Sequence, residues 1–147
     1  MADSFTPPAL RHVARIEVNV SAPILLGALA GLERRMIPII GGTFSSADFR
    51  GVILPGGSDV QSVRSDGTID LLARYAVDLG QYGNLLIENT GIRRAVGPDQ
   101  ADGVPYFRGV VHFCAPPGPL QWLNDSVFVS SGYRDGSTVY LDVMEVL

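Results

Sequence analysis

Short runs in which apolar and polar residues alternate recur along the whole chain. In residues 12–20, the apolar side chains of Ala14, Ile16, Val18 and Val20 fall on one face, with mostly polar residues between them. A period of two is typical of a half-buried β-strand. Comparable runs cover residues 33–40, 49–54, 58–64, 68–79, 84–90, 106–113, 127–133 and 138–146. The pattern therefore predicts about nine strands.

Turn residues separate these runs. Asp66-Gly67 stands between two alternating segments and is a strong hairpin signal, because Asp and Gly tolerate the positive φ of tight turns. Further turns are predicted at residues 41–42, 80–83 and 134–137, and a longer loop at 94–105. Pro38 lacks a backbone N–H, so it is predicted at a sheet edge or a bulge.

No segment has the pattern of a long helix. Residues 116–124 carry three prolines and then Leu120-Gln121-Trp122-Leu123, which predicts one helical turn or a packed corner. An antiparallel sheet of this size must close or stack to protect its edges. We therefore expect an all-β domain, an up-and-down closed barrel of about eight to ten strands, with a sandwich as the alternative. One domain over residues 1–147 is predicted, with residues 1–10 as a poorly ordered N-terminal arm.

The run at residues 68–79 has two different faces. One carries mainly apolar residues, among them Leu71, Tyr75 and Val77, and the other mixes Asp70, Arg74 and apolar residues. The mixed face either meets solvent or lines a barrel interior that holds polar groups around a ligand. The sequence leaves both readings open.

Composition and charge narrow the function classes. The chain has 147 residues, 46% of them hydrophobic, and a formal net charge of -4. Its 11 basic residues are scattered and all are Arg. Because nucleic-acid binding relies on clustered basic residues, it is disfavoured.

The cysteine count and hydropathy address the compartment and the membrane. Cys114 is the one cysteine, which excludes an internal disulfide and fits a reducing compartment. No signal peptide is evident, and the longest apolar stretch, residues 22–32, is interrupted and too short to span a membrane. We expect a cytoplasmic protein.

An ordered set of short motifs resembles one family. The set includes Pro55-Gly56-Gly57-Ser58-Asp59-Val60-Gln61, Arg64-Ser65-Asp66-Gly67, Ala73-Arg74-Tyr75, Glu88-Asn89-Thr90-Gly91-Ile92-Arg93, Tyr106-Phe107-Arg108 and Trp122-Leu123-Asn124. In this order the motifs resemble the uncharacterised domain-of-unknown-function 3237 family (uncharacterised protein family 0311), from about Arg11 onward. The resemblance implies a β-barrel and no established general reaction.

The chain departs from the family pattern at three positions. Val60 stands where an aromatic residue is common, Ser58 replaces a usual Ala, and Cys114 lies where a polar or acidic residue is frequent. If the aromatic residue lines the pocket of relatives, Val60 enlarges or reshapes the cavity here. A substrate is therefore not transferred from the family.

Three charged residues are candidates for catalysis. Asp59 follows a Gly-Gly turn, where it could be a general base or a turn residue that caps backbone amides. Arg74 and Arg108 lie mid-strand among apolar neighbours, so each should pair with a carboxylate or bind an anionic or carbonyl group. We expect the three to converge on one pocket if the protein is an enzyme.

Five further residues are candidates for ligand contact: Gln61, Asn89, Tyr106, Trp122 and Asn124. For Asn89 and Asn124 a capping role is the alternative, and for Trp122 it is plugging a barrel end. His12 and His112 lie in different strands, and neither a metal site nor a cofactor is expected.

Three hypotheses of function follow. The first is a cofactor-independent small-molecule enzyme of isomerase, dehydratase or lyase type, in which an Asp base abstracts a proton next to a carbonyl and Arg holds the enolate. The second is a lipocalin-like carrier, and the third is a self-associating scaffold with a packed interior. The expected ligand is a small apolar or aromatic carbonyl compound. A homodimer or larger homo-oligomer could form through apolar runs such as residues 36–40.

Overall fold

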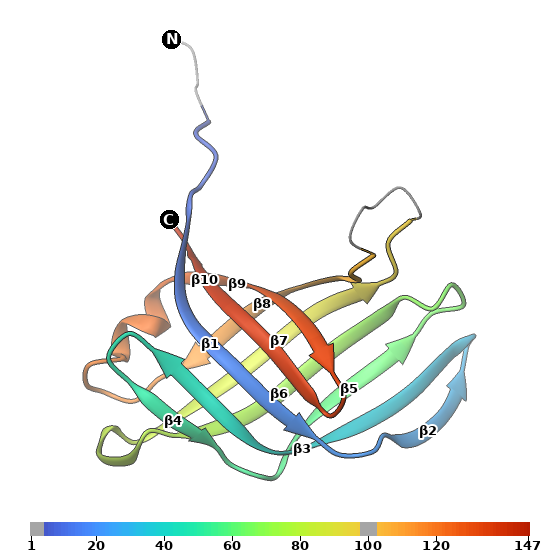
Figure 1. The fold of residues 1–147 in the computed structure, drawn as a ribbon, viewed down its shortest axis with the longest axis horizontal. Coiled ribbons are helices and arrows are strands. Elements are labelled where there is room, and N and C mark those ends of the chain that lie inside the picture. The colour runs from blue at the N-terminus through green and yellow to red at the C-terminus, as the bar shows by residue number, and fades with distance from the viewer. Residues whose placement is uncertain (1–4, 98–102) are drawn as a thin grey trace.

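A computed structural model of the chain describes residues 5–97 and 103–147 (Figure 1). Within these residues it contains ten strands and two short 3-10 helices. The strands are β1 (Leu10–Val20), β2 (Ile24–Leu29), β3 (Leu32–Ser46), β4 (Arg50–Ile53), β5 (Gly57–Val63), β6 (Ile69–Asp78), β7 (Asn84–Arg94), β8 (Tyr106–Cys114), β9 (Val127–Asp135) and β10 (Thr138–Val146). The 3-10 helices are η1 (Gly80–Tyr82) and η2 (Gln121–Asp125).

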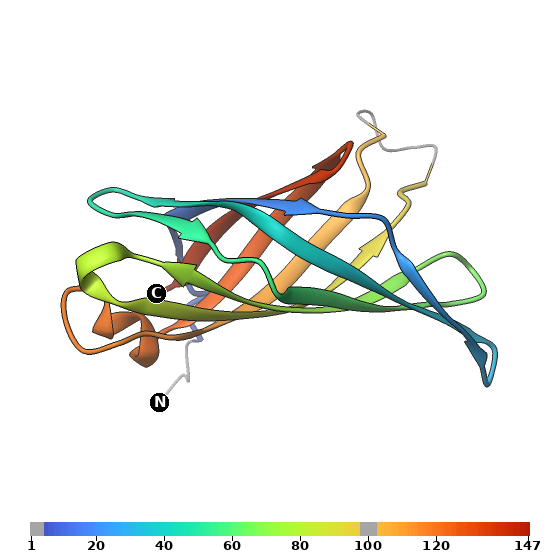
Figure 2. The same cartoon turned by 90° about the horizontal axis from the view of Figure 1, so that it is seen from below.

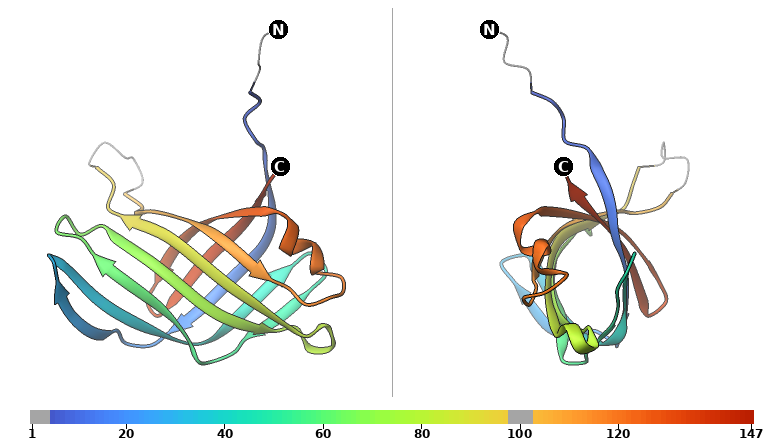
Figure 3. Two further views of the ribbon diagram at one scale, coloured as in Figure 1. Left: turned by 180° about the vertical axis from the view of Figure 1, so that it is seen from behind. Right: turned by 90° about the vertical axis from the view of Figure 1, so that its left-hand side faces the viewer.

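The strands form one antiparallel sheet that closes on itself. From β10 back to β5, strands that follow one another in the chain are neighbours, and β1 pairs with both β10 and β3. Strands β4 and β5 share one position between β3 and β6. Figure 3 (right) shows the ring seen from one end. The expected closed, up-and-down barrel is confirmed, and the sandwich alternative is wrong.

Strand β3 is longer than the sequence suggests. The predicted break at Gly41–Gly42 is wrong, because the strand continues to Ser46 and pairs there with β1 and β4. Gly42 has φ of 135°, and a Cβ at this position would lie 2.0 Å from the carbonyl oxygen of Glu17. Gly42 therefore lets β1 approach β3 closely, and β3 continues through this position instead of ending.

Strand β2 was not predicted, and it lies outside the closed ring. It pairs with the first residues of β3 and forms a hairpin that projects from one end of the barrel (Figure 2). All six of its residues are exposed. The sequence gives no alternation here, because neither face of β2 is buried. The run at residues 36–40 is not an apolar edge, since β3 pairs there with β5, and Ile37 and Ile39 are buried.

The core fills the middle of the barrel and one of its ends. Its largest fully buried side chains include Phe44, Phe128 and Ile16. At the end where η1 and η2 lie, the predicted helical turn is confirmed as η2, and the buried side chains of Leu120 and Leu123 cover the barrel there.

The ends of several strands are fixed by local hydrogen bonds. The predicted Asp66-Gly67 turn is confirmed, with the Thr68 N–H donating to the Asp66 carboxylate at 2.9 Å. The Leu147 N–H donates to the Ala9 carbonyl at 2.8 Å. The predicted arm at residues 1–10 and loop at 94–105 include residues 1–4 and 98–102, which lie outside the described residues. No helix in the described part of the chain is long and apolar enough to cross a membrane.

Two leucines offer a matched test of this packing. Leu85 is 0% exposed inside the barrel and Leu25 is 70% exposed on β2. Leu85→Ala should lower the free energy of unfolding by about 2–5 kcal/mol, because it removes buried contacts and leaves a cavity. Leu25→Ala should change it by less than about 0.5 kcal/mol. Urea unfolding measures both, and equal losses would contradict the assignment of β2 to the outside.

Candidate functional site

The inner faces of three neighbouring strands bring polar side chains together inside the barrel. Asp59 and Gln61 point inward from β5, Tyr75 from β6, and Asn89 from β7. Asp59 lies opposite Ala73 in the β5–β6 ladder, and Ala73 lies opposite Asn89 in the β6–β7 ladder. A closed sheet with a period of two places these residues in adjacent layers of the interior.

A chain of hydrogen bonds runs through Gln61. Its amide nitrogen donates to Asp59 Oδ2 at 2.8 Å, and its amide oxygen accepts from Arg35 Nε at 2.8 Å. Arg35 comes from β3, where it lies opposite Gln61. The buried Gln61 side chain therefore orients the Asp59 carboxylate and links it to a guanidinium.

Two buried oxygen atoms of this site form no hydrogen bond with another described residue. They are Asp59 Oδ1 and the oxygen of the Tyr75 hydroxyl. Burial raises the pKa of Asp59 above its ordinary value, although hydrogen bonds to the carboxylate from Gln61 and the Leu72 backbone, and the charges of Arg35 and Arg134, oppose this shift. Burial, and secondarily the charge of Asp59, raises the pKa of Tyr75. The site thus favours a protonated phenol beside a carboxylate that binds protons more strongly than usual.

A small cavity of about 30 Å³ adjoins these atoms. Asp59, Tyr75 and Asn89 supply its polar wall, and Phe107 and Val139 are among its apolar residues. This volume holds a water molecule but not an organic ligand. The Asn89 amide, oriented to satisfy its neighbours, donates to the carbonyls of Thr90 and Val110 at 3.2 and 3.1 Å.

A larger cleft of about 780 Å³ lies at the barrel end away from η2. It forms where β8 and β9 separate, beyond the last paired residues, Arg108 and Ser131. Phe107 borders both the cleft and the small cavity beside Asp59.

Asp59, Arg74 and Arg108 do not share one pocket, so the expectation that they converge is wrong, and with it the form of the enzyme hypothesis in which Arg74 or Arg108 holds the enolate. Arg74 points outward between the inward-facing Ala73 and Tyr75, its side chain is 63% exposed, and its Nε donates to Glu88 at 2.9 Å. This is the paired alternative that the sequence left open for Arg74. The mixed face of β6 is the solvent face, because the apolar face of that strand fills the barrel.

Arg108 also lies on the outside. It donates to the carbonyl of Phe107 at 2.9 Å, and its guanidinium carbon lies 5.4 Å from the centre of the Tyr106 ring. The guanidinium carbon of Arg94 also lies close to this ring, 4.4 Å from its centre. Both Tyr106 and Arg108 line the outer rim of the large cleft.

The other ligand candidates divide between the two ends of the barrel. Gln61 and Asn89 belong to the interior site. Trp122 lies in η2 at the covered end, 5.9 Å from the Phe128 ring, and is far along the barrel from the polar residues. The Asn124 side chain caps the backbone of Ala115. Its amide oxygen accepts from the Ala115 N–H at 2.8 Å, and its amide nitrogen donates to the Ala115 carbonyl at 3.0 Å.

Two of the three positions that depart from the family pattern, Val60 and Cys114, do not line the barrel interior. Val60 points outward between Asp59 and Gln61, so an aromatic residue there would not line the barrel. Cys114 is exposed at the end of β8. His12 contacts Asp142 on the outer face, at 3.1 Å. The described residues contain no group of three His, Cys, Asp or Glu side chains placed to hold a metal ion.

Sequence reasoning missed Arg35 and Tyr75 of the interior site, and also Arg93 and Arg134, which line the large cleft. The signal that could have found the arginines is the alternation of inward-facing and outward-facing residues along each strand. Arg93 is in phase with the buried Asn89, and Arg134 is in phase with the buried Phe128 and Ser130. Extending the inward phase to the last residue of each strand would have placed these arginines inside the barrel end.

Comparison with known proteins finds a matching family model, related sequences and related structures. The family model described as "Protein of unknown function (DUF3237)" matches residues 8–146. A UPF0311 protein of Clostridium acetobutylicum is 35% identical over 147 residues, 92% of each chain. The crystal structure of a conserved protein of unknown function from Rhodopseudomonas palustris has a TM-score of 0.88 at 31% identity, over 97% of this chain and 100% of that one.

A more distant structure has the same fold. It is described as an enzyme from Penicillium herquei and has a TM-score of 0.77 at 18% identity, covering 100% of both chains. At this identity the similarity concerns the fold alone.

Asp59→Asn tests the electrostatics of the interior. Because the folded-state pKa of Asp59 lies above its ordinary value of 3.8, ionisation costs stability as pH rises from about 4 through that folded-state pKa. The variant should lack this loss, and its free energy of unfolding at pH 7 should exceed that of the wild type by on the order of 1 kcal/mol.

Thermal unfolding between pH 4 and pH 8 measures the effect. Asp70→Asn is the matched control, since Asp70 is exposed and its pKa is lowered by hydrogen bonds from Arg64. That variant should show no gain at pH 7. If Asp59→Asn were less stable than the wild type at every pH, the carboxylate would be a structural strut.

Proposed function

This chain belongs to the DUF3237 family, and we propose that it is a cofactor-independent small-molecule enzyme in which Asp59 acts as the acid–base group. The observation that carries the proposal is the placement of the buried Asp59 carboxylate and the buried Tyr75 hydroxyl against the same small cavity. The pKa of each group is raised by burial. Two adjacent buried titratable groups with shifted pKa values are typical of a functional site.

The proposed reaction begins with proton abstraction next to a carbonyl. Asp59 takes the proton, the C–H electron pair forms a carbon–carbon double bond, and the carbonyl π electrons move to oxygen to give an enolate. The Tyr75 hydroxyl donates a hydrogen bond to that oxygen. Protonated Asp59 then returns the proton to the same carbon or another one, as in an isomerase, or a leaving group departs, as in a lyase or dehydratase.

The surrounding residues suit these roles. A raised pKa makes Asp59 a stronger base, and the raised pKa of Tyr75 keeps its hydroxyl protonated and able to donate. Gln61 holds the carboxylate in one orientation. A substrate in the large cleft would reach Asp59 by displacing the Phe107 ring.

The carrier hypothesis has less support from the geometry. Carriers of the lipocalin kind enclose their ligand within the barrel. The cavity beside Asp59 measures only about 30 Å³, and the rest of the interior toward the η2 end is filled by Phe44, Phe128 and their neighbours. The large cleft at the barrel end also argues against a purely structural scaffold.

Solvent exchange tests the proposed chemistry without knowledge of the natural substrate. Phenylacetone and phenylpyruvate each have a benzylic CH₂ next to a carbonyl, and ¹H NMR in D₂O follows its deuteration. We expect the protein to accelerate exchange of at least one probe over the protein-free rate. Asp59→Asn should lower this acceleration by at least ~100-fold, and Tyr75→Phe by about 10-fold or more.

Asp70→Asn, the exposed matched control, should retain the wild-type rate. Circular dichroism and the melting temperature verify that each variant is folded. An acceleration that survives Asp59→Asn unchanged would overturn the role of Asp59, and no acceleration of either probe would count against enolisation.

Self-association and a cytoplasmic location stay predictions. Strand β2 is the exposed apolar edge that a second copy of the chain would use, with Leu25 and Leu29 about 70% exposed. Sedimentation equilibrium measures the oligomeric state. If a dimer forms through β2, the double variant Leu25→Asp/Leu29→Asp should be monomeric and otherwise folded, whereas a dimer that persists would place the interface elsewhere.

A further inference from the structure

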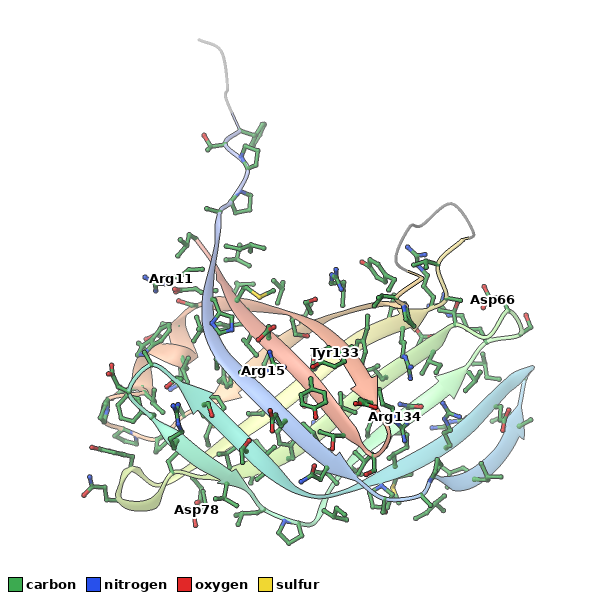
Figure 4. All side chains as sticks on the ribbon, in the orientation of Figure 1. Arg11, Arg15, Asp66, Asp78, Tyr133 and Arg134 are labelled. Carbon is green, nitrogen blue, oxygen red and sulfur yellow. The ribbon has the colours of Figure 1, made fainter. Side chains whose placement is uncertain are left out.

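Three arginines enter the barrel from its open end. Arg35 on β3, Arg93 on β7 and Arg134 on β9 are each in phase with buried residues of their strand, and each is partly buried. Arg93 and Arg134 line the large cleft. Figure 4 labels Arg134 beside the β9–β10 turn, at the same end of the barrel as the β5–β6 turn with Asp66.

Among the described residues, no ion pair joins these three arginines to a carboxylate, a state that they share with the outer Arg34, Arg50, Arg94 and Arg108. On the outside, Arg11 pairs with Glu145, Arg64 with Asp70, and Arg74 with Glu88. Inside, Arg93 has no hydrogen bond or ion pair among the described residues.

The hydrogen bonds of the other two inner arginines go to neutral groups. Arg134 donates from Nε to the Gly136 carbonyl at 2.9 Å, and Arg35 donates from Nε to Gln61. Asp59 accepts a hydrogen bond from Gln61, which separates it from Arg35, but the charges of Arg35 and Arg134 still act on its carboxylate and oppose the rise of its pKa.

The positive charges also act on one another. Burial lowers the pKa of Arg93 first, and the charges of Arg134 and Arg35 lower it further. Holding like charges together in a partly buried site costs free energy, which an anionic ligand would recover. Among the described residues that line the cleft, four arginines, Arg93, Arg94, Arg108 and Arg134, outnumber the one carboxylate, Asp142, which contacts His12 and Arg15 on the outer face.

The shape and lining of the cleft indicate what kind of anion fits. Its volume of about 780 Å³ suits a small organic molecule rather than a simple ion. Tyr106, Phe107 and Tyr133 add aromatic surface beside the arginines. A guanidinium group matches a planar carboxylate with two parallel hydrogen bonds.

We propose that Arg93 and Arg134 bind the carboxylate of a substrate whose apolar or aromatic body lies in the cleft, with its carbonyl directed past Phe107 toward Asp59. Arg35 adds positive charge behind Gln61. The inference rests on the proposed function and makes it specific: the substrate class is a carbonyl compound that also carries a carboxylate.

A matched pair of ligands tests the proposal by binding alone. Phenylpyruvate carries the carboxylate, and phenylacetone has a methyl group in its place. Isothermal titration calorimetry should show that the wild type binds phenylpyruvate at least ~10-fold more tightly, as expected for one charge-assisted contact. The variant Arg93→Gln/Arg134→Gln should reduce this preference to less than about 2-fold.

Arg74→Gln is the control, because it removes an outer arginine by the same substitution and should keep the preference. Phenyl phosphate distinguishes a carboxylate site from a phosphate site: tighter binding than phenylpyruvate would overturn the assignment to a carboxylate. An unchanged preference in the double variant, or none in the wild type, would overturn the proposal itself. Because titration measures binding, these outcomes are separate from a failure of Asp59-dependent exchange.

Discussion

The pairing of β1 with β3 is the contact on which the rest of the structure depends. Seven residue pairs, from Ala14–Ser46 to Val20–Ile39, join the first strand to the long third strand and close the sheet. Closure removes most sheet edges and gives every strand one inner and one outer face. In the closed sheet, alternate residues of a strand face opposite sides, so the position of a residue in this alternation decides whether its side chain meets the core or the solvent.

This constraint explains why residues adjacent in sequence have different roles. Ala73 and Tyr75 line the interior, while Arg74 between them forms an exposed ion pair with Glu88. Exposed pairs of this kind contribute little to stability, typically below about 1 kcal/mol. An inward polar residue is different, because it must find a partner within a limited space or leave its hydrogen bonds unmade.

Most of the fold could be predicted from the sequence, because alternation and turn residues are local signals. The hairpin at Asp66-Gly67 and the turn η2 are examples. The exceptions depend on tertiary context: Gly41 and Gly42 continue β3 because β1 and β4 pair with it there, and β2 has no buried face to produce alternation. For the candidate site, the sequence identified Asp59, Gln61 and Asn89. It misjudged Arg74 and Arg108, because an arginine among apolar neighbours looks the same on either face of a strand.

The two ends of the barrel have opposite requirements, and their residues reflect this. At the covered end, Leu120 and Leu123 complete a continuous apolar core that provides stability. Toward the open end, the same inward phase carries Asp59, Gln61 and then arginines, none of which improves packing. Buried polar groups and like charges in this region reduce stability, and the fold retains them because the packed end supplies enough. An apolar half that supplies stability, together with a polar half that reduces it, is the arrangement expected of the acid–base site proposed at Asp59.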